Sequence, residues 1–248
     1  GKGDITVTGP SSVTQIDPHV ITADHLDITV DGPLTLATEV NSLAVRATSD
    51  VDIDQSGSRT LTVTDLTVAD GSLTINHKDG DINLAYIELP TNTDGEVLQV
   101  TAGGDIQLGN VQAGIYHKTE TAAAKKVTAQ GDVTLTAGGS ISEYGEDATV
   151  DLVADQLTLS AKSGITGLEI AANILASITT DEGDISLTEY DGAGESKPGL
   201  RVEYASATNG SVTISAENNL QAYHVVADKD NSTQQQKRVA LESRHKSL

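Results

Sequence analysis

Apolar and polar residues alternate in short segments along most of the chain. Val133 and Leu135 share one face of such a segment, and Thr134 and Thr136 share the other. A period of two is typical of a strand with one buried and one solvent-exposed face. The segments open with Gly, then Asp or Ser, then an apolar-polar-apolar triplet, at Gly3, Gly80, Gly104, Gly131, Gly183 and Gly210. This recurrence predicts stacked supersecondary units, because one unit alone cannot bury its apolar face.

The first inward residue of each principal strand is expected to mark one coil of the stack. These markers are Ile5, Ile28, Ile53, Ile82, Ile106, Val133, Leu157, Ile185 and Val212. They lie 23 to 29 residues apart, farther than the roughly 8–12 residues that separate strands in a sandwich. A second strand is expected eight residues after the marker, as from Val133 to Ile141. We therefore predict an all-β, single-stranded parallel β-helix (β-solenoid) of about nine coils of roughly 26 residues.

The β-helix repeat domain is expected to cover residues 1–227, with two interruptions. Residues 111–130 contain a stretch of high helix propensity, and either a side-loop or an ordinary coil turn fits them. Residues 188–199 predict a protruding side-loop. Residues 228–248 lose the alternation, so we expect a polar tail, a cap or a linker there. The sequence begins inside a predicted strand, and we therefore expect this chain to be a part of a longer protein.

Composition and charge narrow the class of protein. Aromatic residues make up 2 % of the chain, all of them Tyr, and Phe, Trp, Met and Cys are absent. Stacked Val, Ile, Leu and Ala fill a narrow tube without large rings, so a thin core is favoured. The net charge of −21 disfavours nucleic acid and anionic membranes as partners. We expect no membrane insertion, because no apolar run reaches the roughly 18 residues of a spanning helix.

The segment from Gly131 to Ile141 resembles the filamentous-haemagglutinin-like repeats of large two-partner-secreted bacterial adhesins, and the segment from Gly210 to Leu220 is the second-best match to them. In those repeats a strand of the type Gly-Asp-Val-x-Leu precedes a turn and a second Gly-x-Ile or Gly-x-Leu strand. The resemblance covers most of residues 1–226 and lies in the recurrence of the repeat. It implies a right-handed parallel β-helix in an exported, surface-attached or released protein that serves adhesion, biofilm matrix or display of a distal domain.

Candidate chemistry is sparse, and we predict no catalytic, cofactor-binding or metal-binding residues, no cofactor, and no enzyme. Asp50, Asp52 and Asp54 alternate on one strand face, which places successive carboxylates about 7 Å apart. Calcium needs about six to eight oxygens around one point, so a solvated face is favoured over a cation site. The Asp of each Gly-Asp step is expected to accept backbone hydrogen bonds at a corner.

The remaining motifs also favour structural interpretations. Histidines lack metal-ligand spacing and stand at His19, His25, His77, His117, His224 and His245. Lys2-Gly3-Asp4 resembles an integrin-type tripeptide but is also a strand start. Glycosylation sequons begin at Asn209 and Asn231 and matter only in a host that glycosylates.

Three functions remain open. The first is a structural or adhesive extracellular or cell-surface β-solenoid, whose partners are neighbouring coils or domains of a longer parent protein. An alternative is a filament subunit that stacks end to end on itself. A second alternative is a carbohydrate-binding or carbohydrate-cleaving β-helix that takes surface glycans and needs outward aromatic residues. The six tyrosines are Tyr86, Tyr116, Tyr144, Tyr190, Tyr204 and Tyr223. Of these, Tyr116, Tyr144, Tyr190 and Tyr223 lie at or just past predicted strand ends and are the candidates for such a row.

Overall fold

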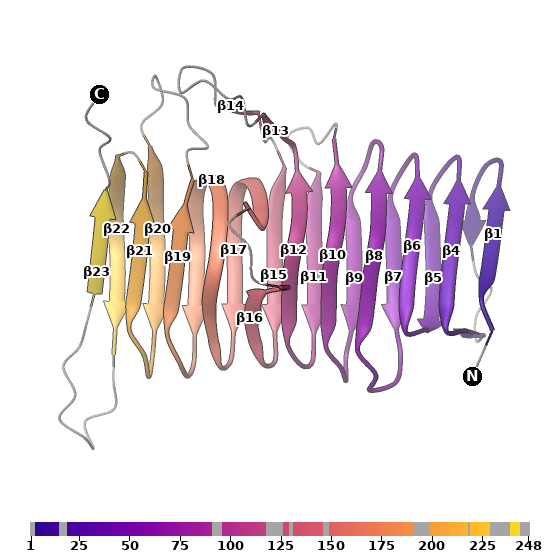
Figure 1. The fold of residues 1–248 in the computed structure, drawn as a ribbon, viewed down its shortest axis with the longest axis horizontal. Helices are drawn as coiled ribbons and strands as arrows, with labels where there is room; N and C mark the ends of the chain where they lie inside the picture. Colours follow the sequence, from indigo (N-terminus) through magenta and orange to yellow (C-terminus); the bar gives the residue numbers. More distant parts are fainter. Residues whose placement is uncertain are drawn as a thin grey trace.

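A computed structural model describes residues 3–14, 19–90, 96–117, 126–128, 131–145, 149–190, 199–217, 219–228 and 239–243. Within these residues the chain forms strands and turns and contains no helix. Almost all of the strands join one sheet in which every pairing is parallel. Figure 1 shows the strands side by side along the longest axis, with the two ends of the chain at opposite ends of the stack. The fold is the predicted β-solenoid of about nine turns.

The strands form two rows that run in opposite directions, so each coil contributes one strand to each row (Figure 1). Row A contains β1 (Ile5–Gly9), β4 (His25–Val30), β6 (Ser42–Ala47), β8 (Leu61–Val68), β10 (Ile82–Leu89), β12 (Ile106–Ala113), β16 (Ser140–Glu143), β19 (Ile185–Glu189), β21 (Val212–Ala216) and β23 (Val239–Ser243). Row B contains β2 (Val13–Thr14), β3 (Ile21–Thr22), β5 (Leu34–Glu39), β7 (Val51–Gln55), β9 (Leu73–His77), β11 (Val97–Ala102), β15 (Asp132–Ala137), β20 (Leu200–Ala207) and β22 (Leu220–Ala227). Two long strands, β17 (Leu152–Ala161) and β18 (Gly164–Thr180), pair with strands of both rows.

The predicted coil markers divide between the two rows. Ile53 and Val133 lie on strands β7 and β15 of row B, and Leu157 lies in the part of β17 that pairs with β15. The other markers lie in row A. Both rows carry the same inward alternation, so the sequence pattern does not distinguish them. Paired coils are 17 residues apart at His25 and Ser42 but 35 apart at Asp105 and Ser140, on either side of the predicted repeat of roughly 26.

The interior is a set of aliphatic ladders. Buried residues of successive coils form one continuous apolar cluster from Ala23 to Ala227. One ladder in row A runs through Leu26, Leu43, Val63, Leu84 and Leu108. The predicted alternation is confirmed at Val133 and Leu135, which are buried, and at Thr136, which is exposed. Stacking of like residues gives each coil a closed apolar interior that depends on its two neighbours.

One inward ladder of row B changes from polar to apolar along the stack. Thr38, Gln55 and His77 are in register with one another and are followed by Ala102 and Ala137. All five side chains are buried. The first coils therefore have a polar interior corner, and alanines occupy that corner in the following coils, with buried Thr180 between Ala161 and Ala207.

A single extra residue alters row A from β8 onward. The pairing of β6 with β8 shifts between Leu43 and Ala44, so that Thr64 and Asp65 both point outward. The hydroxyl of Thr64 donates to the carbonyl oxygen of Leu43 at 3.1 Å. The bulge continues in β10, where Ala85 and Tyr86 both lie on the outer side.

The interruptions have different outcomes. Strands β13 (Ile115–His117) and β14 (Lys126–Thr128) form an antiparallel pair outside the two rows (Figure 1). The described part of residues 111–130 therefore leaves the coil after β12, as the side-loop alternative expected, and residues 118–125 and 129–130 lie outside the described residues. The predicted side-loop 188–199 begins later than expected, because residues 188–189 belong to β19, and residues 191–198 lie outside the described residues. Within 228–248, β23 pairs with β21, so the stack continues into the segment that lacked the sequence pattern.

Candidate functional site

The aspartates of the Gly-Asp motif form a ladder of hydrogen bonds between coils. Asp81 Oδ1 accepts from the backbone amide of Asp105 at 2.9 Å, and Asp105 Oδ1 accepts from the amide of Ser140 at 2.6 Å. The same contact joins Asp184 Oδ1 to the amide of Ser211 at 2.7 Å. The expectation that these aspartates cap the corners is confirmed at these positions.

Glycines at two corners leave space for that ladder. A Cβ atom on Gly104 would lie 2.0 Å from Asp81 Oδ1, and one on Gly139 would lie 2.1 Å from Asp105 Oδ1. Both distances are far below a van der Waals contact. At these two positions the carboxylate of the previous coil occupies the place of a side chain, whereas at Gly183 and Gly210 a backbone carbonyl oxygen of the previous coil occupies it.

The Asp50, Asp52 and Asp54 stripe has mainly structural contacts. Asp50 Oδ1 accepts from the amide of Ser72 at 2.8 Å, and Asp54 Oδ1 accepts from Asn76 Nδ2 at 3.2 Å. Partial burial and the charge of Asp54 raise the pKa of Asp52 above its usual range. Among the described residues, Asp50, Asp52 and Asp54 do not belong to a group of three carboxylates close enough together to share a metal ion.

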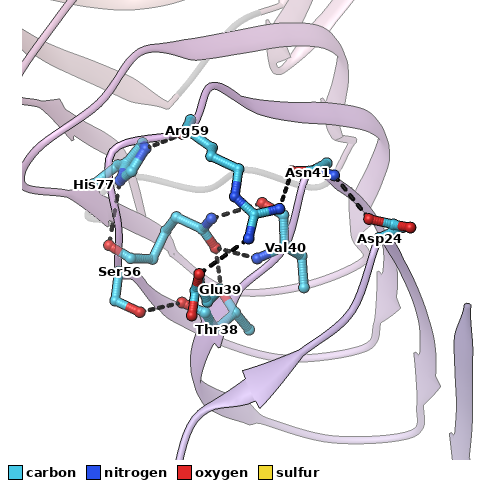
Figure 2. A network of polar contacts seen from close by, with 9 residues as sticks. Asp24, Thr38, Glu39, Val40, Asn41, Ser56, Arg59 and His77 are labelled. Carbon is cyan, nitrogen blue, oxygen red and sulfur yellow. Dashed lines mark hydrogen bonds and ion pairs between the residues drawn. The ribbon is translucent and has the colours of Figure 1, made fainter. Parts of the chain in front are cut away.

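A polar network on the outside of the first coils links them at one corner (Figure 2). Arg59 donates through Nη1 to Asn41 Oδ1 at 2.9 Å and through Nη2 to Glu39 Oε1 at 3.1 Å. Asn41 Nδ2 in turn donates to Asp24 Oδ1 at 3.0 Å. The side chains of Arg59 and Glu39 are 45 % and 37 % exposed, so this ion pair contributes little stability alone.

Gln55 satisfies the buried side of the same corner through Thr38 and Val40. Its Oε1 accepts from Thr38 Oγ1 at 2.7 Å and from the Val40 amide at 3.3 Å, and its Nε2 donates to the Val40 carbonyl oxygen at 2.7 Å. One side chain thereby pairs a buried hydroxyl and both backbone groups of Val40. Such satisfaction is what allows a polar residue in the interior.

His77 follows Gln55 on the same ladder and faces two carbonyl oxygens. Its Nδ1 lies 3.3 Å from Gln55 O, and its Nε2 lies 2.7 Å from Arg59 O. Each ring nitrogen therefore lies within hydrogen-bond distance of a backbone carbonyl oxygen. Both nitrogens are thus occupied by the fold, which makes His77 a structural residue.

Three carboxylates from two adjacent coils converge near the middle of the stack, and the sequence analysis did not find them. Glu143, Asp151 and Glu169 each offer an oxygen within 4.8 Å of the others. Asp151 is 1 % exposed, and its Oδ2 accepts from the amide of Glu169 at 2.9 Å. Three oxygens are part of the roughly six to eight that calcium requires. Glu143 and Asp151 lie in one coil, on either side of the interruption between β16 and β17, and Glu169 lies in the next coil, so the three residues have no common spacing in the sequence.

Burial dominates the electrostatics of this carboxylate cluster. Loss of hydration raises the pKa of Asp151 from 3.8 to about 8, and the charges of Glu169 and Glu143 act in the same direction. The amide of Glu169 opposes the shift by hydrogen bonding to the charged form. A proton held by Asp151 is therefore part of the folded protein at neutral pH.

An open depression of about 550 Å³ lies on the outer side of row A, where the bulge begins. Its lining is Arg46, Thr64, Asp65, Thr67, Tyr86 and Glu88. Arg46 forms an ion pair with Asp65, and the Tyr86 hydroxyl donates to Glu88 Oε2 at 2.9 Å. Burial, first, and then Glu88 and Asp65 raise the pKa of Tyr86 above its usual range, so the phenol is a neutral donor.

The described tyrosines do not follow one row. Tyr86 lies in row A, whereas Tyr204 and Tyr223 lie on adjacent strands of row B. The ring of Tyr204 stacks on His224 with centroids 5.1 Å apart. Tyr223 is 68 % exposed and Tyr144 is 41 % exposed. The side chain of Tyr116 lies outside the described residues.

The short surface motifs have ordinary surroundings. Lys2 lies outside the described residues, and the carbonyl oxygen of Gly3 accepts from the amide of Asp24 at 3.2 Å, as expected of a strand start. Asn209 lies exposed in the turn after β20, and its Nδ2 is 3.3 Å from the carbonyl oxygen of Asp181. Asn231 lies outside the described residues.

No protein-family model, no curated protein and no solved structure matches this chain. The described part of the chain contains no helix with the length and apolarity that crossing a bilayer requires.

Proposed function

We propose that this chain is a rigid β-solenoid segment of a large secreted or surface-anchored bacterial protein, where it gives reach, rigidity and attachment in cell adhesion or in a biofilm matrix. The observation that carries the proposal is the single apolar cluster that continues from the first coils to the last. A stack without a break in its core resists bending between coils. The partners on this proposal are neighbouring coils or domains of the same protein.

Two further features support a structural role outside the cell. The chain carries a net charge of −21, and like-charged rods resist lateral association. The ladder of Asp carboxylates joins consecutive corners through backbone amides, so it stiffens the stack irrespective of side-chain identity at the next coil. The bacterial surface location rests on the resemblance of the coils to secreted adhesin repeats.

Removal of whole coils tests the rod. Leu61, Ile82 and Ile106 occupy the same register position, so deletion of residues 61–105 places Ile106 where Leu61 stood and removes two coils. The shortened chain is expected to keep its β circular dichroism signal. Its maximum dimension in small-angle X-ray scattering is expected to fall by about 10 Å, two strand spacings of about 4.8 Å.

A deletion shorter by one residue is the matched control. Deletion of residues 62–105 places Ile106 at the outward position of Thr62 and brings the next polar residue inward. A slip of one residue reverses the faces of a strand, so this variant is expected to lose cooperative folding. Equal behaviour of the two deletions, or loss of folding in both, contradicts a modular rod.

End-to-end association into a filament is the second candidate function. Ile5, on the first strand, is 36 % exposed, and residues 221–224 of β22 are exposed at the other end of row B. Unpaired strand edges of this kind pair readily with another strand. Sedimentation velocity at increasing protein concentration tests this candidate: growing rods of constant width support it, and a single species at all concentrations rejects it.

A further inference from the structure

The depression at the start of the row A bulge combines one aromatic ring with hydrogen-bonding groups of several kinds. Tyr86 is half-buried, so its ring is held in place and partly open to solvent. Around it lie the hydroxyls of Thr64 and Thr67, a guanidinium and two carboxylates. The volume of about 550 Å³ is in the range of small-molecule sites, about 300–1,000 Å³.

Charge restricts the ligand that this depression accepts. The positive charge of Arg46 is compensated by Asp65, and Glu88 leaves an excess of negative charge in the lining. The whole chain adds a charge of −21. Phosphate, sulfate and carboxylate ligands are disfavoured by this field. A neutral ligand with many hydroxyl groups avoids that penalty and uses every donor and acceptor present.

Planar polar groups of the lining lie at aligned positions on adjacent strands and are already paired with one another. Arg46 and Glu88 are both paired with Thr67 across the strands, so they flank it on the outer face. The ion pair with Asp65 and the contact from Tyr86 to Glu88 hold the charged groups before a ligand arrives. Groups held in this way lose little conformational freedom on binding.

We propose that this depression binds a sugar unit of a neutral polysaccharide, with one apolar ring face packed on Tyr86 and the hydroxyl groups paired with Arg46, Asp65 and Glu88. The depression is open rather than enclosed, so the polymer continues past it along the surface of row A. Binding here gives the rod an attachment point on its side. The site goes beyond the structural role, which holds whether or not sugar binds.

Affinity electrophoresis of the full chain tests the site. Native gels are cast with dextran, yeast mannan, laminarin or hydroxyethyl cellulose as four separate neutral probes. Retardation of the wild type by at least one probe is expected, and Tyr86→Ala should weaken it about tenfold, the upper effect of one aromatic contact. Arg46→Lys keeps the charge but removes the planar fork, and it should also weaken retardation.

Tyr223→Ala is the matched control, because this tyrosine is 68 % exposed on the other row. Its retardation should equal that of the wild type. Absence of retardation by all four probes, or equal retardation of the wild type and Tyr86→Ala, overturns the proposal. Arg46 is exposed on its strand, so Arg46→Lys remains informative if Tyr86→Ala fails to fold. A negative result in the electrophoresis does not change the dimensions of the rod measured by X-ray scattering, so the two proposals are tested separately.

Discussion

The carboxylate of Asp105 accepts hydrogen bonds from both the backbone amide and the hydroxyl of Ser140, at 2.6 and 2.9 Å. These residues are 35 positions apart in the sequence, with the β13–β14 hairpin between them, yet they stack at one corner. The contact joins the coils on either side of the β13–β14 pair. Corner aspartates therefore join coils whose lengths differ.

Asp105→Ala should lower the free energy of unfolding by about 1 kcal/mol or more, because the amide and hydroxyl of Ser140 lose their acceptor. Asp54→Ala is the control, since Asp54 contacts only an exposed side-chain amide at 3.2 Å. That variant should change stability by less than about 0.5 kcal/mol. Urea unfolding followed by circular dichroism compares them, and an equal loss in both contradicts the corner role.

Gly104→Ala should be more destabilising than an ordinary glycine substitution, because its Cβ would lie 2.0 Å from Asp81 Oδ1. Gly3→Ala is the control, since no atom lies within 4 Å of its added Cβ. The clash is partly relieved when the carboxylate is removed, so Gly104→Ala combined with Asp81→Ala should cost less than the sum of the two single changes. Additive melting-temperature losses would argue against the steric coupling.

The sequence pattern predicted the fold because alternation and the recurring Gly-Asp corner are local features that survive changes in coil length. It also placed Gln55 and His77 inward in principle, since each follows a buried isoleucine by two positions. Glu189 follows Leu187 in the same way and is also buried. A stricter reading of the alternation would have found these interior polar residues.

The rest of the candidate sites depended on three-dimensional register. Glu143 and Asp151 meet across an interruption within one coil, Glu169 joins them from the next coil, and no fixed spacing connects the three residues. The depression beside Tyr86 exists because one extra residue enters the stack at Thr64 and shifts the outward positions of β8. Neither the bulge nor the pairing of β23 with β21 has a signature in the alternation.

Gln55→Glu should destabilise the first coils at neutral pH. The carboxylate cannot donate to the Val40 carbonyl oxygen, which now receives a 2.7 Å hydrogen bond from Gln55 Nε2. A buried charge is added at the same place, so a loss of a few kcal/mol is expected. Hydrogen exchange should show the loss in β5 and β7 and little change in β20. A uniform change along the stack would contradict a local interior corner.

Asp151 makes the stability of the fold depend on pH near neutrality. Its pKa is about 8 in the folded chain against an ordinary value of 3.8, so the folded state holds a proton that the unfolded state releases between these values. The unfolded chain binds fewer protons in that window, and stability therefore falls as the pH rises from about 4 to about 8. The contribution is fully present below the lower value and lost above the upper one.

Asp151→Asn removes this dependence while its amide oxygen still accepts from the Glu169 amide. Other carboxylates titrate mainly below about pH 5, and the histidines are common to both proteins. The melting temperature of the wild type should therefore fall more steeply with rising pH between about pH 6 and about pH 8 than that of the variant. Asp54→Asn, at an exposed position, should keep the wild-type slope. Parallel slopes for wild type and Asp151→Asn would show that Asp151 holds no proton in the folded chain, because only a group protonated differently in the two states contributes to the slope.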